Sequence, residues 1–296
     1  MDALLVMGWH LKTFWQGIFA AKHQRIRLLV RGDSHLGTRR HWSKRAIKRL
    51  LYPPLLRLFD AALYVGERNR AYYEHYRYPA RRLFFSPHCV DNAWFAQRAT
   101  AEARAALRAH FGVSDDAFVA LFAGKLLPFK RPGDVIAAAA LCRAGGLPIE
   151  VMIAGSGELE ESLVAEARRA GVPLHMLGFC NQSKMPLAYA ASDVLVLPSN
   201  RETWGLVANE ALACSRPVIV SDACGCAPDL AAYRGVGATF PVGDVEKLAR
   251  TLTAFVDRRR DVPALERAAH QYSLASACNG ILAATEYVTR YKRLPI

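Results

Sequence analysis

The chain has 296 residues, 52% of them apolar, which is enough to bury one large core or two modest ones, and we expect two domains. It contains no run of about 20 apolar residues, so no helix is predicted to span a bilayer. The stretch from Met1 to Phe19 includes Asp2, His10 and Lys12, whereas a signal peptide has an unbroken apolar core. The sequence therefore predicts a cytoplasmic protein.

The first third of the chain alternates between apolar runs and helical stretches. Strands are expected at residues 3–8, 25–32, 61–66 and 82–87, and helices near 11–23, 41–59 and 67–75. This third also holds almost all of the net charge of +13, because residues 1–100 contain 18 lysines and arginines against 6 acidic residues. Such a charge asymmetry suggests an anionic partner for this part of the protein.

The basic residues are densest between Arg39 and Arg57. No acidic residue occurs from Ser34 to Phe59, and seven lysines and arginines alternate there with Trp42, Ile47 and several leucines. A basic amphipathic segment of this kind indicates contact with an anionic membrane surface, which would make the protein peripheral on the inner face of the membrane. The alternative is a solvated helix whose leucines pack against the rest of the domain.

A linker with turn residues Pro87, Asp91 and Asn92 separates this part from a longer alternating region. Six strands are expected at residues 118–124, 149–155, 173–178, 194–199, 217–221 and 237–242, with helices between them, such as 134–144 and 159–170. Strands that alternate with helices form a doubly wound parallel sheet. A last helix is expected from Ala275 to Lys292.

Two carboxylates, Glu202 and Glu210, lie eight residues apart across a turn that contains Gly205. Glu202 follows a buried strand, at the edge where an open parallel sheet binds its ligand, and Glu210 falls about one turn into the next helix. Gly205 lets the backbone approach a phosphate at the start of that helix. A carboxylate accepts two hydroxyl hydrogens, so one glutamate could bind a sugar diol and the other a ribose diol. The alternative is that both are solvated helix-end glutamates.

Two lysines follow the strand that ends at Ala123, in the segment AGKLLPFKRP. Gly124 permits a tight turn, and Lys125 and Lys130 place ammonium groups beside the same edge of the sheet. Cations there would neutralise the charge that develops on a departing nucleoside diphosphate. Taken alone, the two residues would be ordinary solvated lysines.

No metal site is predicted. Cysteines and histidines are scattered without C-x2-C, H-x3-H or H-x-H pairs, which argues against zinc and against a disulfide framework. Asp193 precedes an apolar strand and is interpreted as a turn residue and not as half of a D-x-D metal motif. We therefore expect no cofactor and no metal.

The Glu202–Glu210 pair, the Gly124–Lys125–Lys130 loop and the later segment SDACGCAPDL resemble, in the same order, the retaining glycosyltransferases of family 4. The resemblance covers residues 86–272 well and 2–85 more loosely. It implies the GT-B fold, an α/β fold with two Rossmann-like domains. In this chain the acceptor-side domain would comprise residues 1–92 and the donor-binding domain residues 93–274. A C-terminal helix at 275–296 would cross back to the first domain.

The resemblance also implies roles for the site residues. Lys125 and Lys130 would contact the donor diphosphate, Glu210 the ribose and Glu202 the sugar, with Glu202 and both lysines counted as catalytic. Backbone N–H groups from Trp204, Gly205 and Leu206 would support the phosphate or the sugar, and the backbone at Phe179 and Cys180 would lie against the base. Phe179 could equally be an ordinary core residue.

The first domain departs from the family pattern in two ways. Family members place a histidine after an early strand, where this chain has Gly32 and Asp33, with His35 slightly beyond. Asp33 and His35 are therefore the candidates for the catalytic side of the acceptor domain, and His10 is a weaker one. The opening MDALLVMGW resembles a middle strand of the family's first domain, so this domain is expected to be reduced or incomplete.

The sequence as a whole predicts a retaining, metal-independent glycosyltransferase that moves a sugar from a nucleoside diphosphate such as UDP to an acceptor hydroxyl, in the synthesis of a cell-surface glycan or glycolipid. Its partners would be the nucleotide-sugar and a glycan or lipid-linked acceptor. Two alternatives remain open, a catalytically degenerate nucleotide-sugar-binding protein and a basic nucleic-acid-binding protein. The second leaves the paired glutamates unexplained and lacks an aromatic ladder for bases, so no nucleic acid is expected.

Overall fold

A computed structural model describes residues 2–37, 42–233 and 235–290. The chain forms two compact units. The first comprises Met1–Cys89 and Tyr272–Ile296, and the second comprises Val90–Gln271. The C-terminal helix thus belongs to the same unit as the N-terminal strands.

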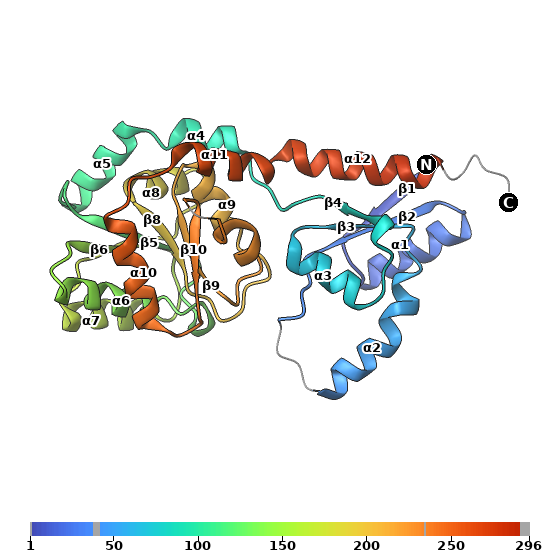
Figure 1. The fold of residues 1–296 in the computed structure, drawn as a ribbon, viewed down its shortest axis with the longest axis horizontal. Helices are drawn as coiled ribbons and strands as arrows, with labels where there is room; N and C mark the ends of the chain where they lie inside the picture. Colours follow the sequence, from blue (N-terminus) through green and yellow to red (C-terminus); the bar gives the residue numbers. More distant parts are fainter. Residues whose placement is uncertain (1, 38–41, 234, 291–296) are drawn as a thin grey trace. The chain divides into compact units, whose positions relative to one another are not determined.

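The first unit is built on a parallel sheet with strand order β1-β2-β3-β4 (Figure 1). Its strands are β1 (Ala3–Val6), β2 (Arg27–Gly32), β3 (Ala61–Tyr64) and β4 (Leu83–Phe85). Its helices are α1 (Lys12–His23), α2 (Trp42–Leu56), α3 (Glu67–His75), the 3-10 turn η1 (Ala80–Arg82) and α12 (Leu274–Arg290).

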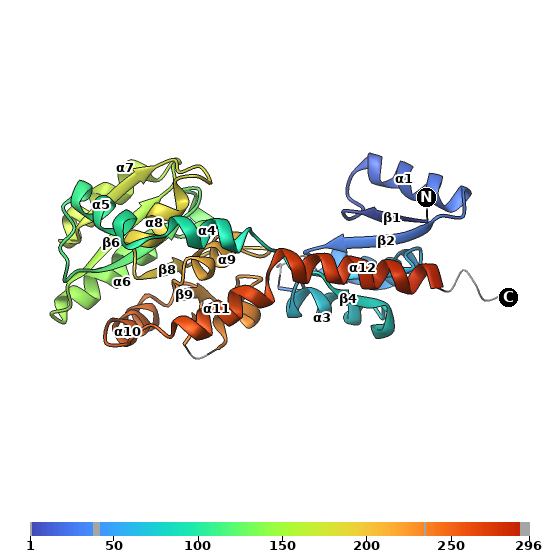
Figure 2. The same cartoon turned by 90° about the horizontal axis from the view of Figure 1, so that it is seen from above.

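Both faces of this sheet are covered, and the side chains of β2 show how. Leu28 and Val30 point to one face and join a cluster with residues of α1, α2 and α3, whereas Leu29 points to the other face and packs with Ala284 and Val288 of α12. This alternation is the period of two that strands impose. Figure 2 shows α12 running along the sheet.

A glycine allows α12 to approach the sheet closely. A Cβ atom at Gly280 would overlap the carbonyl oxygen of Phe85, so a larger residue would push the helix away from β4. The Ser86 hydroxyl donates a hydrogen bond of 3.0 Å to the Ala277 carbonyl in the same region.

The second unit has a parallel sheet with strand order β10-β9-β8-β5-β6-β7. Its strands are β5 (Phe118–Ala123), β6 (Ile149–Ala154), β7 (Leu174–Gly178), β8 (Val194–Leu197), β9 (Val218–Ser221) and β10 (Gly237–Phe240). The chain runs outward from β5 to β7, returns to β8 beside β5, and then runs outward in the other direction. Such a reversal creates a crevice at the carboxyl ends of β5 and β8, where sheets of this kind bind ligands.

Helices cover both faces of the second sheet. The elements are α4 (Asn92–Arg98), α5 (Ala101–Phe111), η2 (Pro128–Lys130), α6 (Gly133–Ala144), α7 (Glu160–Ala170), α8 (Met185–Ala191), α9 (Leu206–Ala213), η3 (Ala227–Ala231), α10 (Val245–Val256) and α11 (Val262–Gln271). Buried side chains of α6, α7 and α10 form one large core with the strands, and α8 and α9 cover the opposite face together with α4, α5 and α11.

The predicted fold class is confirmed, since both units contain a parallel sheet wrapped by helices. All ten predicted strands are present with boundaries close to those expected. The predicted basic helix corresponds to α2, although Arg39, Arg40 and His41 lie outside the described residues, as does Lys292, the predicted last residue of the C-terminal helix. Among the described helices, none is both long enough and apolar enough to cross a bilayer.

Candidate functional site

The loops after β5 and β8 bring together two of the residues expected at the site. Lys130, at the end of η2, forms an ion pair with the carboxylate of Glu202, and both side chains are largely buried. The loops are also joined through the backbone, because the Asn200 N–H donates to the Phe129 carbonyl at 2.9 Å. A cation and a carboxylate are thereby fixed side by side at the crevice.

The loop that carries Glu202 is held from the other side by the segment after β9. The N–H of Gly225 donates to the Glu202 carbonyl at 2.9 Å, and that of Cys226 to the Trp204 carbonyl at 3.1 Å. A Cβ at Gly225 would overlap the backbone oxygen of Thr203, so this close approach requires glycine. The segment SDACGCAPDL therefore positions Glu202.

Two glycines after β6 have a similar role beside Gly124. A Cβ at Gly155 would overlap the Gly124 carbonyl oxygen, and one at Gly157 would lie 2.6 Å from the carbonyl oxygen of Leu126. The Leu126 N–H donates to the Ser156 carbonyl at 3.0 Å. The loops after β5 and β6 are thus packed against each other, and the two glycines make this close packing possible.

Glu210 lies in the first turns of α9 and is partly buried. Its Oε2 atom accepts a hydrogen bond of 2.8 Å from the hydroxyl of Tyr189, which is fully buried in α8. Burial raises the pKa of Glu210, and the bond from Tyr189 opposes this shift. The carboxylate is oriented by one of its oxygens, which leaves the other as the acceptor available to a ligand.

Gly205 and Trp204 shape the start of α9. Gly205 has a φ of +107°, and a Cβ there would lie 2.8 Å from a side-chain carbon of Leu197. The indole of Trp204 is buried and donates to the Asn209 side chain at 2.8 Å. Any contact of Trp204 with a ligand would thus have to be through its backbone. Leu206 begins the helix, whose first N–H groups have no helical partners.

The remaining expected donor residues lie at the carboxyl ends of β5 and β7. Lys125 is exposed directly after Gly124. Phe179 follows Gly178 at the end of β7 and is 74% exposed, so it is not a core residue. Cys180 is half-buried, and burial raises the pKa of its thiol, with Lys184 opposing the shift. Phe179 thus offers an open aromatic face two strands from β5.

The first unit has a pocket of about 320 Å³ at the carboxyl ends of β1 and β2. Aromatic rings of Trp9, Tyr52 and Tyr72 contribute to its wall, together with polar groups of Asp33 and His10. Its remaining lining residues are Met7, Gly8, Gly32, Ser34, Lys48, Asn69 and Tyr73. The Asp33 side chain is partly exposed, and His88 Nε2 lies 3.8 Å from its Oδ2.

Asn69 fixes the loop that carries Asp33. Its side chain donates to the Ser34 carbonyl at 2.7 Å and accepts from the Val65 N–H at 3.1 Å. His35 lies differently from Asp33, because it is only 8% exposed and its Nδ1 accepts a hydrogen bond of 3.1 Å from the Gly37 N–H. His35 does not line the pocket.

The part of the chain that the structure describes contains no group of three or more His, Cys, Asp or Glu side chains arranged to hold a metal ion. Asp193 is occupied by Arg104 and Arg108, at 2.8 and 2.7 Å. Cys224 and Cys226 are buried thiols, and burial raises the pKa of Cys224 to about 12.

A comparison with protein families matches residues 103–272, more than half of the chain, to the family described as glycosyl transferases group 1. The chain belongs to this family. The matched region contains the lysines, the paired glutamates and the glycine turns described above. The family resemblance inferred from these motifs is therefore confirmed.

Curated members of the group 1 family with similar sequences include D-inositol 3-phosphate glycosyltransferases. The protein from Mycolicibacterium smegmatis is 34% identical over 211 residues, which cover 66% of this chain and 47% of the relative. The one from Geodermatophilus obscurus is 35% identical over 167 residues, covering 53% of this chain and 36% of the relative. The chain thus matches less than half the length of these two relatives.

Solved structures show the same fold at low sequence identity. Anabaena Alr3699/HepE in complex with UDP has a TM-score of 0.74 and 17% identity, covering 98% of this chain and 78% of that protein. The lipopolysaccharide outer core galactosyltransferase WaaB has a TM-score of 0.72 and 14% identity, covering 99% and 76%. The fold of this group 1 family member is therefore GT-B.

Sequence reasoning missed Tyr189, which orients Glu210, and Phe129, whose ring lies 5.0 Å from the Arg201 guanidinium. Tyr189 occurs in the apolar stretch MPLAYAA, which reads as helix core. Its spacing to Glu210 carries no local signal, because the two residues lie on different helices. Phe129 lies between Pro128 and Lys130, so its position beside a predicted site lysine could have identified it as a candidate site residue.

Proposed function

We propose that this chain transfers a sugar from a nucleoside diphosphate-sugar to an acceptor hydroxyl, with retention of configuration and without a metal ion. The observation that carries the proposal is the Lys130–Glu202 ion pair at the point where the strand order reverses. On a sugar diphosphate, the sugar hydroxyls adjoin the phosphate. A cation beside a carboxylate matches this pattern of charge and hydrogen-bond donors.

In the proposed complex, Lys130 and Lys125 bind the diphosphate and Glu202 accepts hydrogen bonds from the sugar hydroxyls. The free oxygen of Glu210 accepts from the ribose, with Tyr189 holding the carboxylate in place. The N–H groups at the start of α9 support the phosphate. Phe179 and Cys180 remain the proposed neighbours of the base.

The reaction breaks the bond between the anomeric carbon and the phosphate oxygen and forms a bond to the acceptor oxygen on the same face. The acceptor proton moves to the leaving diphosphate. Negative charge develops on that diphosphate as the bond breaks, and the lysine ammonium groups stabilise it. The two lysines would thereby do the work that a metal ion does elsewhere, and chelation should leave the rate unchanged.

The pocket of the first unit is the proposed acceptor site. Trp9, Tyr52 and Tyr72 offer apolar ring faces for the C–H surface of a sugar, and Asp33 offers a carboxylate for its hydroxyls. Asp33 is the better of the two catalytic-side candidates, since His35 is buried away from this pocket. Asp33 would orient the acceptor hydroxyl.

UDP is the proposed nucleotide, because the solved structure of Alr3699/HepE contains it. Synthesis of a cell-surface glycan or glycolipid is proposed by analogy with WaaB, the lipopolysaccharide outer core galactosyltransferase. Both assignments rest on proteins under 20% identical to this chain.

A panel of UDP, GDP and ADP with their sugars tests the proposal by thermal shift. A ligand at 100 times its dissociation constant stabilises the fold by about 2.7 kcal/mol. The stabilising nucleotide-sugar is then incubated with sugar acceptors, and proton NMR reports the anomeric configuration of the product. Retention with full activity in EDTA is expected. Binding without transfer would favour a degenerate donor-binding protein, and binding of DNA but no nucleotide would favour a nucleic-acid-binding protein.

The proposed peripheral membrane contact rests on α2. Trp42 and Leu50 are 74% and 76% exposed on this helix, and Ile47 and Leu51 are exposed as well. Arg45 and Arg49 lie exposed among them. Exposed apolar and basic side chains on one helix suit the interface of an anionic bilayer, where each basic residue contributes about 1 kcal/mol.

Sedimentation with liposomes tests this contact. Binding should rise with the fraction of phosphatidylglycerol and fall with salt, and Arg45→Gln with Arg49→Gln should weaken it. The matched control is Arg168→Gln with Arg169→Gln, which removes the same charge from exposed positions of α7. Equal sedimentation of the two variants would indicate that α2 is an ordinary solvated helix with no membrane contact.

A further inference from the structure

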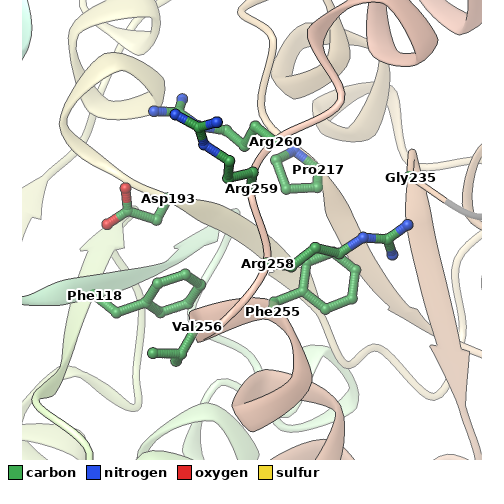
Figure 3. A pocket seen from close by; sticks show the side chains of 9 residues that line it. All are labelled: Phe118, Asp193, Pro217, Gly235, Phe255, Val256, Arg258, Arg259 and Arg260. Atoms are coloured by element: carbon green, nitrogen blue, oxygen red, sulfur yellow. The ribbon is translucent and has the colours of Figure 1, made fainter.

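The second unit has another pocket, at the amino ends of its strands. Its wall includes Phe118 at the start of β5, Asp193 just before β8 and Pro217 just before β9. The last residues of α10 and the loop that follows complete it (Figure 3). The donor residues lie at the carboxyl ends of the same strands, so this pocket is at the opposite edge of the sheet.

Three consecutive arginines, 258–260, form the mouth of this pocket, which has a volume of about 250 Å³. Figure 3 shows Arg258 extending toward Gly235, and Arg259 and Arg260 extending in the opposite direction. Among the described residues, none of the three guanidinium groups forms an ion pair with a carboxylate. The pocket therefore has cations without fixed counter-ions.

The nearby carboxylates do not cancel this charge. Asp193 is already bonded to Arg104 and Arg108 and also accepts from the Val119 N–H at 2.9 Å. Asp261 caps α11 by accepting from the Ala264 N–H at 3.0 Å, and Asp257 is exposed at the end of α10. The lining of the pocket thus holds three arginines and one aspartate, and this aspartate already has two arginine partners.

The environment of Arg260 favours the binding of an anion beside its guanidinium group. Desolvation by the surrounding protein lowers its pKa, which nearby Asp193 raises and Arg104 lowers further. A guanidinium that is partly desolvated beside another cation is stabilised when an anion binds. The side chain remains accessible to solvent, so a ligand can reach it.

The floor of the pocket is apolar. Phe118, Pro217, Phe255 and Val256 line it. An inorganic anion would leave these surfaces uncovered, whereas an anion that carries an apolar group would cover them and contact the arginines at the same time. Guanidinium groups bind phosphate oxygens in a bidentate manner, which selects a phosphate over a simple carboxylate.

We propose that this pocket is a second ligand site, separate from the donor site, which binds a small soluble phosphate ester with an apolar or aromatic body. The phosphate lies between Arg259 and Arg260, whose side chains extend in the same direction, and Arg258 adds positive charge on the other side of the pocket. The body of the ligand packs against Phe118 and Phe255. This site is independent of the proposed glycosyl transfer.

Titration calorimetry with phenyl phosphate and with inorganic phosphate tests the proposal on the whole chain. Phenyl phosphate should bind with a dissociation constant on the order of 1 mM, weakened by salt. Replacing all three arginines by glutamine should weaken this binding by at least about tenfold, because two charged contacts and one further positive charge of the pocket are lost. Phe118→Leu should weaken phenyl phosphate but leave inorganic phosphate unchanged, and Phe118 is only half-buried, so the variant should still fold.

The control is a triple variant with the same change in charge, Arg168→Gln, Arg169→Gln and Arg267→Gln, all exposed and outside the pocket. It should bind phenyl phosphate like the wild type. Equal binding by the pocket variant and the wild type would overturn the proposal, as would equal losses in pocket and control variants. The proposal would also be overturned if the pocket variant lost binding to phosphatidylglycerol vesicles but still bound phenyl phosphate like the wild type. That result would assign the three arginines to contact with a lipid surface.

Discussion

Replacing Glu210 by glutamine should change folding stability and nucleotide binding in opposite directions. Glutamine has the same shape, and its carbonyl oxygen can still accept the hydrogen bond from Tyr189, so α8 and α9 keep their packing. What the substitution removes is the negative charge. The variant is therefore expected to melt at a higher temperature than the wild type and to bind the nucleotide less tightly.

The stability change follows from the raised pKa of Glu210. Because burial raises this pKa in the folded state, the folded protein holds the proton more tightly than the unfolded chain. Protonation of Glu210 thus stabilises the folded protein, relative to the unfolded chain, when the pH is below the unfolded pKa of this residue. This stabilisation is lost as the pH rises through the folded pKa. At neutral pH the buried charge opposes folding, and the neutral amide does not.

The loss of binding follows from the free carboxylate oxygen. One oxygen of Glu210 accepts the hydrogen bond from Tyr189, so in the proposed complex the ribose hydroxyls depend on the other oxygen. Hydrogen bonds to a charged group contribute about 1.5–3 kcal/mol, which corresponds to about 10- to 150-fold in the dissociation constant. Wild-type affinity should also fall as the pH drops through the folded pKa of Glu210, since the protonated form accepts less well.

Differential scanning calorimetry and isothermal titration with UDP measure the two effects. The control is Glu246→Gln, which removes the same charge from an exposed position of α10 whose only ion pair is an i,i+4 contact with Arg250 among the described residues. This control should leave UDP binding unchanged. A Glu210→Gln variant that binds UDP like the wild type, or one that melts at a lower temperature, would refute the reasoning.

Four further substitutions test other features of the two units. Lys125→Ala should lower turnover by about 100-fold or more while the melting temperature stays constant, since the side chain is exposed and would stabilise only the leaving group; steady-state rates measure this. Gly155→Ala should lower the free energy of unfolding, measured in urea, by about 1–3 kcal/mol because its Cβ would overlap the Gly124 carbonyl. Gly17→Ala should instead stabilise α1 by up to about 1 kcal/mol, since its Cβ would meet only a side-chain carbon of Leu4 at 3.7 Å. Asp193→Asn should cost about 3–5 kcal/mol in the same assay, since it leaves the buried Arg108 without its carboxylate; a cost below 1 kcal/mol would contradict this.

The fold could be predicted because both sheets are parallel and buried on both faces. Runs such as FVALFA and VLVL are continuously apolar and short, which separates them from the longer helices between them. The order of the strands could not be read from this alternation. The reversal at β5 and β8 depends on which strand the chain returns to, and this is a tertiary choice.

The positions of candidate site residues were predictable where they depend on local motifs. The Lys130 and Glu202 positions follow from a lysine loop after one strand and a glutamate after another, and parallel strands bring both to one edge. Trp204 shows the limit, because the family resemblance implied a role only for its backbone N–H, and nothing in the sequence indicated that its indole is turned inward to Asn209. Long-range partners such as Tyr189 leave no periodic signal in the sequence.

The central claim is that Glu202 recognises the sugar of a nucleotide-sugar bound beside Lys130. Isothermal titration of UDP and of a UDP-sugar into the wild type and Glu202→Gln tests it most directly. The wild type should bind the UDP-sugar more tightly than UDP, and this difference should disappear in the variant while UDP itself binds with similar affinity. An undiminished preference for the UDP-sugar in the variant would contradict the claim.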